Sequence, residues 1–465
     1  MFRPAACFAV LCLAAPVSAQ DDAAVVRTAS AVQRGGAGTG ARLAQPHLDP
    51  AAECLQLLRA TRAADAPPRD VTVAQLRRLF PVALPAALDW VAAGRLPATA
   101  TDDGDQALSE PQIEYLLEGI APLGRHTLVA AANEWLGDRD DIHARRAVLV
   151  LARAAADSRD LAWLVQLAAP LPDAEQDPSL ERAFEQNLLA MFRGDLRALP
   201  AVVATRNMIP DTLQAAYTRA LGGSRDERAV VGLRHVWDRG AAGEVLVLAQ
   251  IRLLPTPRDG ADVEELASRL RRELDRIDPG SSARLQALVF ALGHLEDWHS
   301  AALLVPLLEH GDRGVKDAVL WSLRRISGAN FAADPAHWRD WCKTELAWYE
   351  GRAEKLVQQL ASGDAKRASL ALRELVGHRM FRHPLVAMLD VLLASEDKKA
   401  RVAACQTLAQ LGSQRAQRAL LERLEDRDKS VRDAAWQALV TLAGRDLPRT
   451  RLECLAELFP AGPVF

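Results

Sequence analysis

The stretch LEDRDKSVRDAAWQAL, residues 424–439, decides the fold. Two earlier stretches follow the same frame, LASEDKKARVAACQTL at 393–408 and LEHGDRGVKDAVLWSL at 308–323. In each, a Leu is followed by an Asp, then by an apolar and a basic residue side by side, and then by a second Leu. The Asp falls in a turn, where its carboxylate can cap the amides of the next helix. We therefore expect each copy to form one helical hairpin.

The frame recurs along the chain. It is found around Asp364 and Asp140, where the basic residue is displaced by one position. Asp278 lies in a close variant of the frame, and the residues around Asp177 keep only half of it. The Asp residues at 278, 312, 364, 397 and 428 are separated by 34, 52, 33 and 31 residues. A period near 33 is typical of an array in which stacking buries the apolar face of each unit. We predict an all-α fold, an α-solenoid over 138–465.

In the last unit, a basic residue lies beside the turn carboxylate. We expect Asp428 to cap the helix that follows it, and Arg432 to reach the Asp of an adjacent unit. Such pairs would form a ladder along the array.

Composition supports helices and excludes several classes of protein. The 465 residues are 49% hydrophobic but only 5% aromatic, so Ala, Leu and Val supply most of the apolar mass. The net charge of -3 argues against a nucleic-acid partner. We interpret the four cysteines outside residues 1–19 as free thiols packed in helices, since they show no C-x-x-C spacing; they are Cys54, Cys342, Cys405 and Cys454.

On these residues, the chain resembles a HEAT-repeat protein, particularly the exported bacterial type similar to the HEAT-like units of phycobilisome lyases. The resemblance covers roughly 138–460 and is strongest over 300–442. It implies a right-handed stack of helical hairpins whose second helices line a concave face. It also implies a scaffold for protein contacts, with the repeat Asp and Arg residues in structural roles.

The N-terminal third divides differently. Residues 1–19 have the order of a signal peptide: a basic start, an apolar run, and small residues before Gln20. We therefore expect an exported, periplasmic or extracellular protein with no integral membrane segment after cleavage. Residues 20–50 are interpreted as a flexible lead-in and 51–137 as an irregular helical region. There, one helix is expected after Asp70 and another at Ser109.

An insertion at about 329–351 lengthens one step of the array. It carries Asp334-Pro335, a helix start, followed by Trp338 and Trp341 on one face of that helix. We interpret the two indoles as a clamp that packs the inserted helix onto the stack. The alternative is an aromatic patch that docks a partner.

Motifs for catalysis are absent from the sequence. It has no H-E-x-x-H, no G-x-S-x-G and no phosphate-binding loop, so we predict no catalytic, cofactor or metal site. The weaker candidates are a metal group at 294–299 and an anion-binding group at 378–383, which we interpret as a helix end and a solvated inter-repeat turn. We predict a non-enzymatic scaffold for a protein partner. The alternative is a lyase-like or other enzyme accessory protein with a site in the N-terminal region.

Overall fold

The computed structural model describes residues 49–63, 65–99, 104–137, 139, 141–170, 176–256, 260–278, 280–362 and 364–459. Helices dominate this part of the chain, which confirms the all-α prediction. The predicted signal peptide, and the lead-in up to Leu48, lie outside the described residues. Among the described helices, none combines the length and apolar character that crossing a bilayer requires.

The first elements are short helices and one small hairpin. They are α1 (Pro50–Ala60), α2 (Arg69–Leu79), α3 (Leu84–Ala93), β1 (Arg95–Leu96), β2 (Gln106–Ala107), α4 (Glu110–Ile120) and α5 (Gly124–Leu136). The two strands pair antiparallel, with Arg95 opposite Ala107. As expected, Ser109 caps α4, and Gln112 completes a capping box. Helix α2 begins earlier than predicted, so Asp70 lies in its first turn and Pro68 precedes it.

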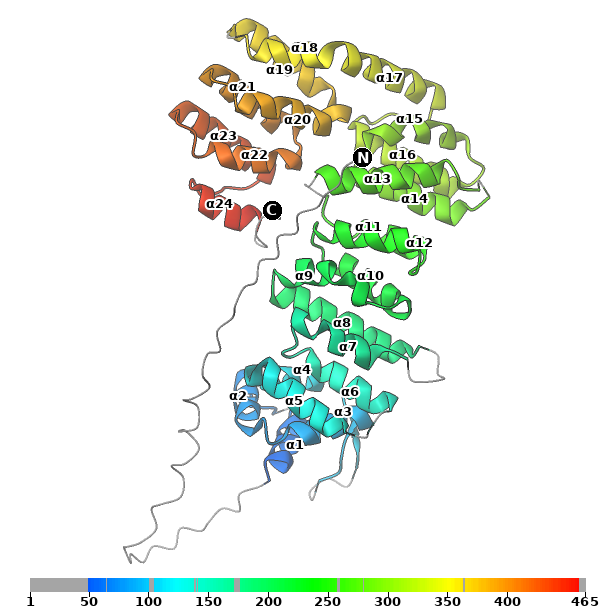
Figure 1. The fold of residues 1–465 in the computed structure, drawn as a ribbon, viewed down its shortest axis with the longest axis vertical. Helices are drawn as coiled ribbons and strands as arrows, with labels where there is room; N and C mark the ends of the chain where they lie inside the picture. The colour runs from blue at the N-terminus through cyan, green and yellow to red at the C-terminus, as the bar shows by residue number, and fades with distance from the viewer. Residues whose placement is uncertain are drawn as a thin grey trace, which may run out of the picture. The chain divides into compact units, whose positions relative to one another are not determined.

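The remaining helices succeed one another as stacked hairpins (Figure 1). In the first half they are α6 (Ile142–Ala152), α7 (Leu161–Ala168), α8 (Pro178–Gly194), α9 (Ala198–Ala204), α10 (Gln214–Gly223), α11 (Ala229–Arg239), α12 (Glu244–Ile251), α13 (Gly260–Leu274) and α14 (Ser282–His294). They continue as α15 (Ala301–Leu304), α16 (Arg313–Ser327), α17 (Pro335–Trp348), α18 (Glu354–Leu360), α19 (Ala365–Gly377), α20 (Arg382–Leu393), α21 (Lys398–Leu411), α22 (Gln417–Arg423), α23 (Lys429–Ala443) and α24 (Arg451–Leu458).

Each hairpin consists of a first and a second helix packed together, and second helices stack on second helices. The stacked series are α8, α10, α12, α14 and α16, and then α19, α21 and α23. Helix α14 supplies residues to two hydrophobic cores, one formed mainly by the helices before it and one by the helices after it. At its end, Gly293 lies directly against Ser322 of α16, so a larger residue at Gly293 has no space there. The four cysteines of this part are free and buried, as predicted.

The repeat carboxylates cap most of the helices that follow them. Amides of the following helix donate to Asp177, Asp312, Asp364 and Asp397, at the starts of α8, α16, α19 and α21. Two expected positions are wrong or not described: Ser281 rather than Asp278 precedes α14, and Asp140 lies outside the described residues. The adjacent Asp141 caps α6 instead.

The ladder prediction is right for one arginine and wrong for another. Arg401 in α21 donates to Asp426 at 2.9 Å and to Asp428 at 2.6 Å, both in the turn of the next repeat. Asp428 therefore makes no cap bond to α23, contrary to expectation. Arg432 in α23 binds the backbone oxygens of Asp426 and Arg427 in its own turn. Within the described part of the chain, the hydrogen bonds of Arg432 stay in its own turn, since α24 does not continue the frame.

The insertion forms the added helix α17. It begins at Pro335, and the carboxylate of Asp334 accepts from the amides of Ala336 and His337. A π-helical turn, η7 (Tyr349–Ala353), joins α17 to α18 without a break. π-Helical turns are rare and recur at functional sites, which draws attention to what this one contacts.

Candidate functional site

The two tryptophans of the insertion differ in burial. Trp338 is 0% exposed, and its indole N–H donates to the carbonyl oxygen of Ala332 at 2.9 Å. Trp341 is partly buried and meets the rings of Phe331 and Trp338 edge-on, with centroids 5.7 and 5.8 Å apart. Docking of a partner by this pair stays a prediction, and Trp338 has no exposed surface to offer.

The groups considered at 294–299 and 378–383 come together at one point. Glu296 lies in the turn after α14, and its carboxylate accepts from His383 Nε2 at 2.7 Å and from Arg382 Nη2 at 2.6 Å. Arg382 also donates to the backbone oxygens of Ile326 and Arg325. Arg382 and His383 are buried, so interpreting them as a solvated turn was wrong. Glu296 thus ties the turn after α14 to the start of α20.

Glu296 adopts a backbone φ of 54°, which is unusual for a residue with a side chain. The strained turn is held in place because the carboxylate has two strong donors on α20. A carboxylate buried this far must be paired, and Arg382 at 2.6 Å and Arg325 at 3.4 Å supply the positive charge.

Protonation in this cluster is set by burial and by the neighbouring charges. Burial and the charges of Arg415 and Arg382 lower the pKa of His383 to about 4, against the pull of Glu296. The ring is therefore neutral at pH 7: Nε2–H donates to Glu296, and Nδ1 accepts from the Ser413 hydroxyl at 2.9 Å. Burial alone would raise the pKa of Glu296, but its hydrogen bond from His383 and the charge of Arg382 lower that pKa to about 2.

Three residues of metal-ligand type lie beside this cluster: Glu264, Asp297 and His299, with ligand atoms within 4.8 Å of one another. Arg271 already donates to both carboxylates, to Glu264 at 2.9 Å and to Asp297. The guanidinium thus occupies an oxygen of each carboxylate and offsets one of their two negative charges. His294, the remaining histidine of the 294–299 group, contacts the backbone oxygen of Leu254 instead.

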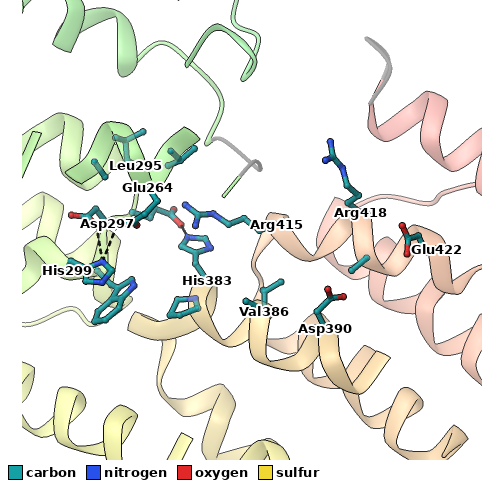
Figure 2. A pocket seen from close by; sticks show the side chains of 17 residues that line it. Glu264, Leu295, Asp297, His299, His383, Val386, Asp390, Arg415, Arg418 and Glu422 are labelled. Atoms are coloured by element: carbon teal, nitrogen blue, oxygen red, sulfur yellow. Dashed lines mark hydrogen bonds and ion pairs between the residues drawn. The ribbon is translucent and has the colours of Figure 1, made fainter. Parts of the chain in front are cut away.

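A hollow of about 580 Å³, the first hollow, opens next to the cluster (Figure 2). It is lined by α13, the turn after α14, α20, and the segment from η9 (Gln414–Ala416) into α22. Arg415 extends across it toward Glu264 and His383, while Asp390 and Glu422 lie on the other side (Figure 2). The hollow therefore joins hairpins that are far apart in the sequence.

The wall of the first hollow is supported by rings from the insertion. Trp298 stacks on His299, with centroids 3.7 Å apart, and both line the hollow. Behind them, Tyr349 of the π-helical turn lies 5.5 Å from Trp298 and stacks on Phe381 at 4.4 Å. The insertion thus helps to fix the position of the hollow's wall.

A second hollow, of about 400 Å³, adjoins the first and shares Arg415 and Arg418 with it. It lies among α9, α11, α13 and α22. Its apolar lining residues are Pro200, Val203, Ala204, Val230, Val231 and Phe459. Both hollows are lined by first helices and turns, whereas the family resemblance implied that second helices line a concave face.

Arg415 and Arg418 were not singled out by the sequence. Neither guanidinium makes a hydrogen bond or ion pair with a residue that the structure describes. The Nε of Arg415 is buried without an acceptor. Their segment, SQRAQRAL at 413–420, has the composition of an ordinary helix start. Only the folded chain shows that both residues face two hollows.

Comparison with known proteins gives the class of the C-terminal part. A family profile described as HEAT repeats matches residues 353–440 and 384–462. This part of the chain is therefore built of HEAT repeats. The crystal structure of an engineered protein is similar at 18% identity and a TM-score of 0.24, covering 88% of this chain and 92% of the other. No curated protein matches the sequence.

Proposed function

We propose that this protein is a non-enzymatic scaffold that binds a partner protein through the two adjoining hollows. The observation that carries the proposal is the pair Arg415 and Arg418, which face both hollows without a partner among the described residues. Arg418 is exposed and Arg415 is partly exposed, so their guanidiniums can donate to oxygen atoms of a ligand. HEAT repeats in 353–462 fit this role, since stacked hairpins offer extended surfaces for protein contacts.

The charged groups beside Arg415 favour binding over catalysis. Glu296 and His383 are hydrogen-bonded to each other, and Asp297 accepts from Arg271, so these groups act first as contacts within the protein. Their ion pairs hold distant hairpins together. This arrangement suits a preformed surface that changes little when a partner binds.

We also propose that the protein is exported, on the basis of residues 1–19. The mature chain would begin near Gln20. Mass-spectrometric sequencing of the native N-terminus tests this, and recovery of Met1 would count against export.

The binding proposal is tested by quantitative affinity enrichment from the native envelope fraction. The baits are the wild-type chain, Arg418→Glu and Arg313→Glu. Arg313 is a matched control because it undergoes the same charge change and its side chain is 92% exposed on α16, away from both hollows. We expect a partner that the wild type and Arg313→Glu enrich equally and that Arg418→Glu loses. Equal enrichment by all three baits would contradict the proposal.

A further inference from the structure

The two hollows differ in chemistry. Apolar side chains from α9, α11 and the end of the described chain surround the second hollow, including Val203, Val231 and Phe459. A volume of about 400 Å³ is enough for a large apolar side chain with part of its backbone. The second hollow therefore suits an apolar residue of a bound segment.

Arg415 and Arg418 stand at the boundary between the hollows. The Arg415 side chain extends toward Glu264 and His383, whereas the Arg418 side chain extends away from them (Figure 2). The two guanidiniums therefore offer separate positions to a ligand. The carboxylates Glu264, Glu296 and Asp297 lie near Arg415, but they are already paired with Arg271, Arg382 and His383. Arg418 is exposed and lines both hollows, so its guanidinium can pair with a carboxylate of a bound segment.

The far side of the first hollow has the opposite charge. Asp390 of α20 is exposed, and it makes no ion pair within the described part of the chain. Glu422 of α22 lines the same hollow (Figure 2). Its side chain is 60% exposed, and Arg423 lies 3.6 Å from it. These two carboxylates suit a basic group.

We propose that the two hollows together bind an extended peptide segment of the partner that carries, in order, an apolar, an acidic and a basic residue. The apolar side chain occupies the second hollow, the acidic side chain pairs with Arg418, and the basic side chain faces Asp390 and Glu422. The assignment rests on the proposed function, because it takes the ligand to be a protein. It adds the chemistry by which the partner is recognised.

The test uses fluorescent peptides and the full chain. Each peptide has Leu, Asp and Lys in this order, separated by none, one or two glycines, in a Gly-Ser background with blocked ends. Controls exchange Asp and Lys, replace Asp by Lys, or replace Leu or Asp by Ser. Fluorescence anisotropy gives the affinity of each peptide for the wild type, Arg418→Glu and Arg313→Glu.

At least one spacing should bind the wild type, and the replacement of Asp by Ser should weaken binding about tenfold or more. Arg418→Glu should weaken binding to a similar extent and should prefer a peptide with Lys in place of Asp, whereas Arg313→Glu should behave as the wild type. The inference is overturned if the order of the residues has no effect, or if both variants weaken binding equally.

Failure of this inference is distinguishable from failure of the proposed function. If enrichment of the native partner depends on Arg418 while no peptide shows an order preference, the recognition chemistry is wrong and the binding surface stands. If neither measurement depends on Arg418, the binding surface is also wrong.

Discussion

His383 donates from Nε2 to the carboxylate of Glu296 over 2.7 Å, although 87 residues separate them. In a stack of hairpins, each unit ordinarily contacts only its neighbours. This hydrogen bond instead joins the turn after α14 to the start of α20, with two further hairpins and the insertion between them in the sequence. Glu296 and His383 both line the first hollow, so this contact holds one of its walls in place.

Replacement of Glu296 by Gln should destabilise the fold by about 3–5 kcal/mol, because it leaves the buried guanidinium of Arg382 without its countercharge. The matched control is Glu396→Gln, which breaks an exposed pair with Arg427 at 2.8 Å. That control should leave the denaturation midpoint nearly unchanged. Urea melts of the two variants beside the wild type measure the difference, and equal midpoints would show that the contact between distant hairpins contributes little.

Stability should fall on acidification in two stages. His383 has a folded pKa of about 4 against an ordinary 6.5, so between these values the unfolded chain binds a proton that the folded chain does not. The loss in this window is at most about 3 kcal/mol. Glu296, with a folded pKa of about 2 against 4.5, adds a further loss below about pH 4.5.

The first stage is checked by urea melts at about pH 7 and about pH 5. In His383→Gln, the difference in unfolding free energy between the two pH values should shrink relative to the wild type. An unchanged difference would mean that other groups, such as His294, whose burial lowers its pKa, are responsible.

Arg401 and Arg432 occupy the same position in successive repeats, but replacing them by Ala should destabilise the fold to different extents. Arg401→Ala leaves Asp426 and Asp428 without their buried partner and should cost about 3–5 kcal/mol. Arg432→Ala removes only bonds to carbonyls of its own turn and should cost about 1 kcal/mol. Thermal melts of the two variants decide this, and a reversed order of melting temperatures would refute the assignment of the ladder to Arg401.

The two tryptophans of the insertion should also differ in how much they contribute to stability. Trp338→Ala should destabilise by about 3–5 kcal/mol, since the ring is fully buried, and Trp341→Ala by less. Denaturant melts of both single variants provide the measurement. A Trp338→Ala variant with wild-type stability would contradict the clamp.

The local parts of this fold could be predicted from the sequence, and the site could not. Asp312, Asp334 and Asp397 were identified as helix starts because a cap depends only on the residues beside it. The contact between Glu296 and His383 depends on the rotation accumulated over several hairpins, which no short pattern encodes. Arg415 has no distinguishing neighbours in the sequence, and its unpaired guanidinium is visible only once the hairpins are in place.

The central claim is that a partner protein occupies the two hollows. Site-specific photo-cross-linking tests it most directly, with a photoreactive residue at Ala204, which lines the second hollow and is exposed, or at the control position Val82, which is 68% exposed before α3. In the native envelope, we expect Ala204 to yield one dominant cross-linked protein that Val82 does not yield and that Arg418→Glu abolishes. The same product from both positions, or a product at Ala204 that is unaffected by Arg418→Glu, would contradict the account.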